Sequence, residues 1–167
     1  MKLKEFNELP PEVLKELLST CCGSAKWIGL MLQAAPYHSE EQLFDAADRS
    51  WQGCVEEDWL EAFRHHPKIG DLESLKKRFA TTRHLAVKEQ ASVGEAREDT
   101  LLALREGNEA YEKKFGFIFI VFATGKSADG MLGLLEQRLL NDRGTELRTA
   151  AAEQHKITLL RLKKLLE

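Results

Sequence analysis

Cysteine is scarce in this sequence, and its arrangement does not suit a disulfide framework. The 167 residues include three cysteines, Cys21, Cys22 and Cys54, so the count is odd and two of the three are adjacent. Zinc sites commonly contain Cys-x-x-Cys pairs, and the sequence has none. We therefore expect three reduced thiols, as in an intracellular protein, rather than disulfides.

Long apolar runs and targeting signals are lacking as well. No stretch reaches the roughly 18 apolar residues of a membrane-spanning helix. The charged start Met1–Glu5 is not followed by the apolar core of a signal peptide. The residues Lys163–Glu167 do not form a peroxisomal Ser-Lys-Leu address. We expect a cytoplasmic protein with no membrane partner.

An excess of positive charge is also missing. Lysine and arginine number 24 against 27 acidic residues, which gives a net charge of -3 at pH 7. This balance provides no general attraction to nucleic acid or to an anionic membrane. A helix-turn-helix DNA-binding protein would also need a basic recognition helix, which the sequence does not contain. Nucleic acid is therefore not an expected partner.

Apolar residues recur at helical spacing along nearly the whole chain. A chain of 167 residues suits one domain and can bury a core without disulfide or metal staples. We therefore predict an all-α fold in one compact domain over residues 1–167, with a loop at residues 81–84 and a further segment at 85–91. The expected helices run from Pro10 to Gly23, from Ser24 to Pro36, from Ser39 past Trp51, up to His66, from Asp71 to Phe79, from Gly94 to Lys114, from Ser127 to Leu139 and from Thr145 to Leu166.

The apolar run Phe117–Ala123 is the exception to this helical pattern. Propensity alone favours a buried β-strand for it. A lone strand has no ladder partner, and its backbone N–H and C=O groups need partners if they are buried. Two other interpretations remain open, a continuation of the preceding helix or an extended stretch whose amides face a ligand.

The segment Phe63–Asp71 is the first candidate for a functional site. Pro67 disfavours α geometry at the preceding residue, so the helix before it should end at or near His66. This arrangement holds an imidazole at a helix terminus, and histidine changes its charge near neutral pH. His65 and His66 lie about 100° apart around a helix axis, so they are not expected to face one site together. A histidine in the last helical turn can also be only a cation favoured by the helix dipole.

The other local candidates have plain structural alternatives. Glu89 and Gln90 could belong to a solvated helix face, and Arg161 could be a cation near a helix C-terminus. The three cysteines have little electropositive support and fit structural thiols better than redox sites. A metal-dependent hydrolase using His65, His66, Asp71 and Glu89 is a further alternative, although no HExxH or EF-hand pattern is present.

Taken together, the motifs are more specific than any one of them. The sequence resembles the 2-oxo-4-hydroxy-4-carboxy-5-ureidoimidazoline (OHCU) decarboxylase family of urate degradation, from Phe6 to Leu162. The blocks that resemble it are, in order, His66-Pro67-Lys68-Ile69-Gly70, Glu89-Gln90, Asn108-x-x-Tyr-x-x-Lys-Phe-Gly-Phe-x-Phe-Ile up to Ala123-x-Gly125, and Glu146-x-x-x-Ala-x-x-Glu-x-x-Lys-Ile-x-x-x-Arg161-Leu.

The resemblance implies an all-helical, cofactor-free and usually homodimeric enzyme that binds no metal and forms (S)-allantoin. His66 matches the catalytic histidine of the family and Glu89 its partner carboxylate. The positions that match substrate-binding residues are Pro67, Gln90, Phe117, Ile118, Phe119, Ile120, Val121 and Arg161. In the family, backbone groups of the Phe117–Ala123 stretch contact the ligand.

The sequence departs from the family pattern at two positions. Ala86 stands where the family often has a serine three residues before the glutamate, so a hydroxyl contact with substrate is missing or comes from Thr81, Thr82 or His84. Lys68 stands where arginine is common, which keeps the charge but loses the planar fork. Ala86 is also the one sequence feature that favours the alternative of a non-catalytic binding module with the same fold.

The chemistry of the implied substrate suits these residue types. Its carboxylate sits on a carbon that also bears a hydroxyl, beside a C=N bond that can accept the electrons when carbon dioxide leaves. We expect His66 to act as the general base for the hydroxyl proton and Glu89 to fix the tautomer and orientation of the ring. Arg161 and Gln90 are expected to hold the anionic substrate by directional hydrogen bonds.

Overall fold

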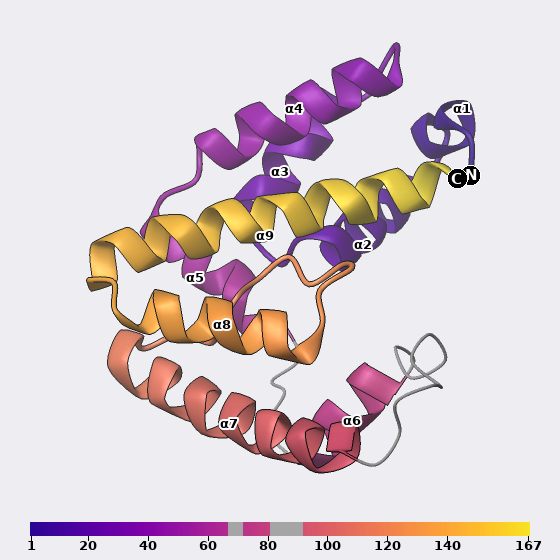
Figure 1. The fold of residues 1–167 in the computed structure, drawn as a ribbon. Coiled ribbons are helices and arrows are strands. Elements are labelled where there is room, and N and C mark those ends of the chain that lie inside the picture. The colour runs from indigo at the N-terminus through magenta and orange to yellow at the C-terminus, as the bar shows by residue number, and fades with distance from the viewer. Residues whose placement is uncertain (67–71, 81–91) are drawn as a thin grey trace. The chain divides into compact units, whose positions relative to one another are not determined.

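The computed structural model describes residues 1–66, 72–80 and 92–167. Within these ranges it has nine helices and no strand, which confirms the predicted all-α fold. No helix in this part of the chain is both long and apolar enough to cross a membrane. The helices are α1 Leu3–Asn7, α2 Pro11–Cys21, α3 Ala25–Ala34, α4 Glu40–Gln52, α5 Glu56–Arg64, α6 Leu72–Ala80, α7 Ser92–Phe115, α8 Ala128–Leu139 and α9 Arg143–Leu166 (Figure 1).

The chain forms two compact units, which we describe separately. Unit 1 combines Met1–His66 with Leu147–Glu167, and unit 2 comprises Pro67–Glu146. The helices α1 to α5 and most of α9 belong to unit 1, whereas α6, α7 and α8 belong to unit 2. The single domain expected over residues 1–167 stays a prediction.

Three helices begin at the serine residues where the sequence predicts their starts, and each serine caps its helix. The Ser24 hydroxyl accepts the Trp27 N–H at 3.2 Å, Ser39 accepts that of Gln42 at 3.1 Å, and Ser127 accepts that of Gly130 at 3.0 Å. Each hydroxyl satisfies one of the backbone donors that a helix start leaves without an intrahelical partner. Local sequence therefore fixes the starts of α3, α4 and α8.

Two helix starts differ from the prediction by two residues. α7 begins at Ser92 rather than Gly94, and α9 begins at Arg143 rather than Thr145. The second difference has a clear cause, because the Asp142 carboxylate accepts the Thr145 N–H at 2.8 Å and so caps α9 from within the expected loop. Sequence analysis also missed the short helix α1. The expected Asp71 cap, the 81–84 loop and the 85–91 segment lie outside the described residues.

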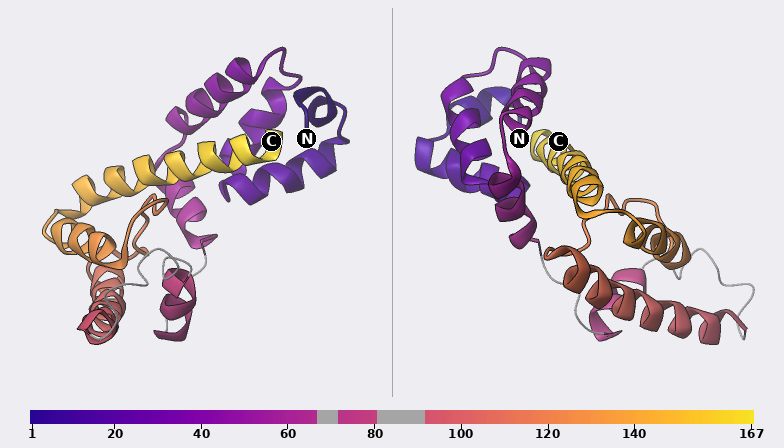
Figure 2. Two further views of the ribbon diagram at one scale, coloured as in Figure 1. Left: turned by 45° about the vertical axis from the view of Figure 1, so that its right-hand side comes forward. Right: turned by 90° about the vertical axis from the view of Figure 1, so that its left-hand side faces the viewer.

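The core of unit 1 gathers around α3 and α9. Phe6, Leu18, Trp27 and Leu162 are fully buried. Hydrogen bonds from two indoles satisfy backbone carbonyls in this core: the Trp27 Nε1–H donates to Ala47 at 3.2 Å and the Trp51 Nε1–H to Ala151 at 3.1 Å. The chain termini lie side by side in all views (Figures 1 and 2), where the Met1 amine donates to the Leu165 carbonyl at 2.9 Å.

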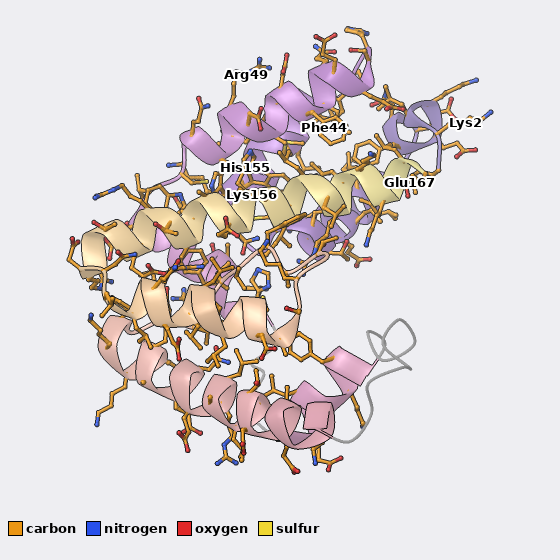
Figure 3. All side chains as sticks on the ribbon, in the orientation of Figure 1. Lys2, Phe44, Arg49, His155, Lys156 and Glu167 are labelled. Atoms are coloured by element: carbon orange, nitrogen blue, oxygen red, sulfur yellow. The ribbon has the colours of Figure 1, made fainter. Side chains whose placement is uncertain are left out.

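A histidine on α9 ties this helix to α4. The His155 side chain lies on the side of α9 that faces α4 (Figure 3), and its Nε2 is 2.6 Å from the Asp48 Oδ1. The ring also stacks on Trp51, with 6.1 Å between ring centroids and 5° between the planes. The Asp48–His155 pair therefore holds α9 in place at the residue after Gln154. Gln154 contacts a candidate site residue described below.

Unit 2 has a buried charge network between α7, α8 and the start of α9. Arg138 is 7% exposed and Glu146 is fully buried, with Arg138 Nε donating to Glu146 Oε1 at 2.6 Å. The Tyr111 hydroxyl donates to the same carboxylate oxygen, and Asn141 Nδ2 donates to Oε2 at 3.0 Å. Burial, and then the hydrogen bond to Glu146, raise the pKa of Tyr111, so the phenol keeps its proton and remains a donor.

Arg138 also holds the apolar run Phe117–Ala123, which follows α7. Gly116 ends α7 with a positive φ of 81°, a conformation that glycine adopts without a Cβ clash. Residues 117–123 are then neither helix nor strand, so the strand favoured by propensity and the helix continuation are both wrong. Arg138 Nη1 donates to the Ile120 carbonyl at 2.5 Å, which supplies the backbone partner that a lone strand would lack.

The helices α7 and α8 pack closely at a glycine. A Cβ built at Gly107 would lie 2.6 Å from Cδ2 of the fully buried Leu135, whereas one built at Gly133 within α8 would meet nothing within 4 Å. We predict that Gly107→Ala lowers the free energy of unfolding by about 1–3 kcal/mol through overpacking.

Gly133→Ala is the matched control for this substitution. It should raise the free energy of unfolding by about 0.5–1 kcal/mol, because alanine stabilises a helix interior relative to glycine. Urea unfolding followed by far-UV circular dichroism measures both variants. Equal effects of the two substitutions would contradict the close packing at Gly107.

We predict a large loss of stability when the charge network of unit 2 loses its cation. Arg138→Met leaves the buried Glu146 carboxylate without its charged partner and should cost about 3–5 kcal/mol in the free energy of unfolding. The double variant Arg138→Met/Glu146→Leu should recover a substantial part of this loss, because no buried charge then remains. Denaturant unfolding of the single and double variants tests this coupling, and additive losses would rule it out.

Candidate active site

The candidate catalytic histidine lies immediately after α5. The helix ends at Arg64, His65 is its C-cap, and the His66 N–H donates to the Phe63 carbonyl at 3.1 Å. The predicted helix end near His66 is therefore confirmed. His66 is half-buried in unit 1.

The His66 ring is bound to the middle of α9. Its Nε2 forms a hydrogen bond with Oε1 of Gln154, a residue that is fully buried. Gln154 Nε2 in turn donates to the Thr158 Oγ1 at 3.2 Å, and the Thr158 hydroxyl donates to the Gln154 carbonyl at 3.1 Å. One turn of α9 thus holds an imidazole that is 88 residues away in the sequence.

Burial keeps the Cys22 thiol, which lies beside Thr158 of this helical turn, protonated. Burial raises the pKa of Cys22 to about 12, although a hydrogen bond with the Thr158 side chain acts in the opposite direction. Burial likewise raises the pKa of Cys21 to about 11. All three cysteines are free and buried, which confirms the expectation of thiols without disulfides. These thiols retain their protons near neutral pH and do not provide nucleophiles.

His65 and His66 have different surroundings, as the helical geometry predicts. The His65 ring packs on the backbone at Gly23, where a Cβ would lie 2.3 Å from its Cγ. His66 instead contacts α9 through Gln154. The described residues contain no group of three or more His, Cys, Asp or Glu side chains placed to bind a metal.

Arg161 lies two turns after Gln154 on α9 and reaches the C-terminal end of α2. Its Nη1 lies 3.3 Å from the Thr20 carbonyl oxygen and 3.4 Å from that of Cys21. These carbonyls belong to the last turn of α2, which has no intrahelical donors for them and carries the negative end of the helix dipole. Because a guanidinium has five N–H donors, this contact leaves capacity for an anionic ligand.

The predicted binding segment in unit 2 presents buried and half-buried side chains. Phe117, Ile120 and Val121 are buried, while Ile118 and Phe119 are half-buried. The Arg138 guanidinium lies 4.6 Å from the centroid of the Phe119 ring in addition to binding the Ile120 carbonyl. The segment therefore has a fixed backbone, and its contact with substrate stays a prediction.

Several predicted site residues lie outside the described part of the chain. They include three of the predicted site residues, Pro67, Glu89 and Gln90, so the proximity of Glu89 to His66 stays a prediction. The two departures from the family pattern, Lys68 and Ala86, are outside it as well. Asp71 and Glu89 of the alternative metal set also lie there.

Sequence analysis assigned no role to Gln154, although α9 contained a signal. The buried positions of the helix recur at helical spacing, and three of them are polar or charged rather than apolar. A polar side chain on an apolar helix face needs a hydrogen-bond partner when it is buried. The buried positions are Glu146, Leu147, Ala150, Ala151, Gln154, Thr158 and Leu162.

Known proteins resemble this chain over most of its length. The sequence model of the OHCU decarboxylase family matches residues 7–163. The uric acid degradation bifunctional protein TTL of Arabidopsis thaliana is 36% identical over 154 residues, which cover 92% of this chain and 48% of that protein. This chain thus spans about half the length of the plant relative. The 2-oxo-4-hydroxy-4-carboxy-5-ureidoimidazoline decarboxylase of Haloferax volcanii is 26% identical over 163 residues, covering 97% of this chain and 94% of that one.

Solved structures agree with these sequence relatives. A crystal structure of OHCU decarboxylase in the presence of (S)-allantoin matches with a TM-score of 0.71 and 37% identity, covering 91% of this chain and 97% of that chain. A crystal structure of (S)-allantoin synthase matches with a TM-score of 0.69 and 19% identity, covering 100% of this chain and 54% of that chain, and it supports the fold alone. Because the family model covers almost the whole chain and includes both His66 and Arg161, this protein belongs to the OHCU decarboxylase family.

Proposed function

We propose that this protein is a carboxy-lyase that converts OHCU into (S)-allantoin in urate degradation without a cofactor. The observation that carries this proposal is the match to the OHCU decarboxylase family over residues 7–163. The chain is also 37% identical to a decarboxylase that was crystallised in the presence of (S)-allantoin. We extend the proposal to a homodimer, which the family resemblance supports, and to the cytoplasm, which the free thiols support.

The reaction divides into two proton and electron movements. When the bond to the carboxylate breaks, its electron pair forms a double bond between the hydroxyl-bearing carbon and the ureido carbon, and the C=N electrons move to nitrogen. Carbon dioxide leaves, and the ring serves as the electron acceptor. The ring nitrogen that received the C=N electrons takes up a proton, the hydroxyl loses its proton to become a carbonyl, and the ureido carbon gains a proton on one face. The protein has to orient the carboxylate, accept one proton and control which face receives the other.

His66 is the proposed general base for the hydroxyl proton. It is half-buried, and its hydrogen bond to α9 fixes the direction of the ring. A positioned base typically contributes about 10²–10⁴-fold to the rate. Glu89 is the proposed carboxylate partner that stabilises the imidazolium once the proton has been taken.

Substrate binding is assigned to groups with directional donors. The Arg161 guanidinium and the Gln90 amide would hold the carboxylate and the ureido group by hydrogen bonds. Pro67 would shape the turn after His66, and the backbone of Phe117, Ile118, Phe119, Ile120 and Val121 would offer the remaining contacts. The fixed position of this segment, through Arg138 and the Ile120 carbonyl, supports that role.

We predict that His66→Ala lowers the rate of (S)-allantoin formation by about 10²–10⁴-fold, because the positioned base is lost. The assay generates fresh OHCU from urate with the two preceding enzymes and follows the chirality of allantoin by circular dichroism. His65→Ala is the matched control, since this exposed neighbouring histidine packs on Gly23, and it should retain turnover.

Two results of this assay would contradict the proposal. Near-wild-type turnover by His66→Ala would refute the assignment of the base. Racemic allantoin at the spontaneous rate with the wild-type protein would instead favour a non-catalytic binding module of the same fold.

We also predict that Arg161→Met lowers kcat/KM by about 10–100-fold, because charge-assisted hydrogen bonds contribute roughly 1.5–3 kcal/mol. Lys163→Met removes an exposed cation two residues later on the same helix and should leave kcat/KM unchanged. Steady-state kinetics and thermal unfolding are measured for both variants. If Arg161→Met lowers Tm but not kcat/KM, the arginine serves only to fasten α2 to α9.

A further inference from the structure

The Arg138 guanidinium in unit 2 makes hydrogen bonds in two directions. Along one edge, its Nε donates to the Glu146 Oε1 at 2.6 Å and its Nη2 lies 2.5 Å from the same oxygen. Its Nη1, which lies outside that edge, donates to the Ile120 carbonyl at 2.5 Å. A planar guanidinium holds these two partners at a fixed angle, whereas a lysine ammonium is a single point of charge. The Glu146 carboxylate therefore sets the direction in which Arg138 meets the backbone at Ile120.

This carboxylate is itself held in place by other side chains. Glu146 is fully buried and accepts hydrogen bonds from the Tyr111 hydroxyl and from Asn141 Nδ2 in addition to Arg138. Each of these donors comes from a different part of unit 2, namely α7, the residues after α8, and α8. The guanidinium is consequently anchored on a fixed group, so its contact with Ile120 is fixed as well.

Arg138 contacts two consecutive residues of the segment Phe117–Val121. Besides binding the Ile120 carbonyl, the guanidinium carbon lies 4.6 Å from the centroid of the Phe119 ring. The Phe119 ring also meets the Tyr111 ring edge-on, with 5.2 Å between centroids and 70° between planes. A cation on an aromatic ring and a charge-assisted hydrogen bond to a carbonyl are both attractive contacts. The segment is thus held through a side chain and through its backbone.

The bond to the Ile120 carbonyl also affects the N–H of the next residue. The peptide between Ile120 and Val121 is trans, so its carbonyl and its N–H point in opposite directions. Because the carbonyl points at Arg138, the Val121 N–H points away from the guanidinium. A donor bound to the carbonyl oxygen of a peptide polarises that peptide and makes its N–H a stronger donor. The Val121 N–H is therefore both oriented and strengthened by Arg138.

We propose that Arg138 is a positioning residue for substrate binding, which fixes and polarises the Ile120–Val121 peptide so that the Val121 N–H is a preorganised donor for an oxygen atom of the substrate. This inference rests on the proposed function, which assigns substrate contacts to the backbone of this segment. It gives the buried charge network of unit 2 a role in ligand binding in addition to its role in stability. Arg138 acts through the backbone.

NMR of the wild-type protein tests the donor directly, because the sequence contains a single Ile-Val pair, Ile120–Val121. Protein labelled with ¹³C at the isoleucine carbonyl carbon and with ¹⁵N in valine therefore gives one carbonyl-to-amide correlation, that of the Val121 N–H. On saturation with (S)-allantoin, followed by titration calorimetry, the Val121 amide proton should move downfield and exchange more slowly with solvent. An unchanged Val121 signal in the saturated protein would overturn the inference.

Arg138→Lys tests the role of the arginine without removing the charge beside Glu146. One ammonium cannot reproduce the fork that spans Glu146 and Ile120. KM for OHCU should rise by about tenfold, because one hydrogen bond to the substrate is weakened, and kcat should change less. The response of the Val121 signal to (S)-allantoin should be lost. If Arg138→Lys folds and keeps the wild-type KM, the positioning role is refuted, and this result needs no bound product.

Tyr111→Phe is the matched control within the same network. It removes one donor to the Glu146 carboxylate and keeps the ring that meets Phe119, while the bond from Arg138 to the Ile120 carbonyl stays. Tm should fall, whereas KM and the Val121 signal should remain as in the wild type. If Tyr111→Phe raises KM as much as Arg138→Lys at a similar loss of Tm, a general loosening of the network explains both, and the inference fails.

The two proposals can fail separately. Wild-type protein that forms no (S)-allantoin above the spontaneous rate would refute the proposed function, whatever the Arg138 variant does to the Val121 signal. Wild-type protein that forms (S)-allantoin, together with an Arg138→Lys variant of unchanged KM, would refute only the positioning role of Arg138.

Discussion

The hydrogen bond between the His66 ring and the Gln154 amide is the interaction on which the candidate site depends. It joins the end of α5 to the middle of α9 and gives the imidazole a direction that the turn after a helix cannot provide alone. Both sides of this bond on α9 are held in place. The Gln154 amide donates to Thr158, and the next residue, His155, binds Asp48 on α4. A ring that is held in this way does not need to be reoriented when a ligand binds, and positioning of this kind lowers the barrier of a reaction.

In unit 2, buried charged side chains rather than a neutral amide hold neighbouring segments in place. Arg138 and Glu146 are buried together, and every hydrogen bond they make constrains either a helix or the irregular run after α7. A buried ion pair is a weak source of stability by itself, because desolvation offsets much of its attraction. Its value here is geometric, since the guanidinium gives the Ile120 carbonyl a partner and lets a non-helical segment stay buried.

Local features of the fold were predictable from sequence, and long-range partners were not. The caps Ser24, Ser39 and Ser127 and the terminator Gly116 act within a few residues, so their effect can be read from a short window. The Asp142 cap was missed because it stands inside a stretch rich in loop residues. The strand propensity of Phe117–Ala123 misled because propensity does not reveal that an arginine elsewhere in the chain supplies a backbone partner.

Gln154 was overlooked because a polar residue on an apolar stripe becomes informative only once burial is known. The roles of Pro67, Glu89 and Gln90 stay predictions based on family resemblance.

A crystal structure of this protein with (S)-allantoin bound tests the assignment of His66 and Arg161 most directly. If His66 and Arg161 form the reaction site, the ligand will lie within hydrogen-bond distance of the His66 ring and of the Arg161 guanidinium. A ligand that binds elsewhere and contacts neither side chain would contradict this assignment.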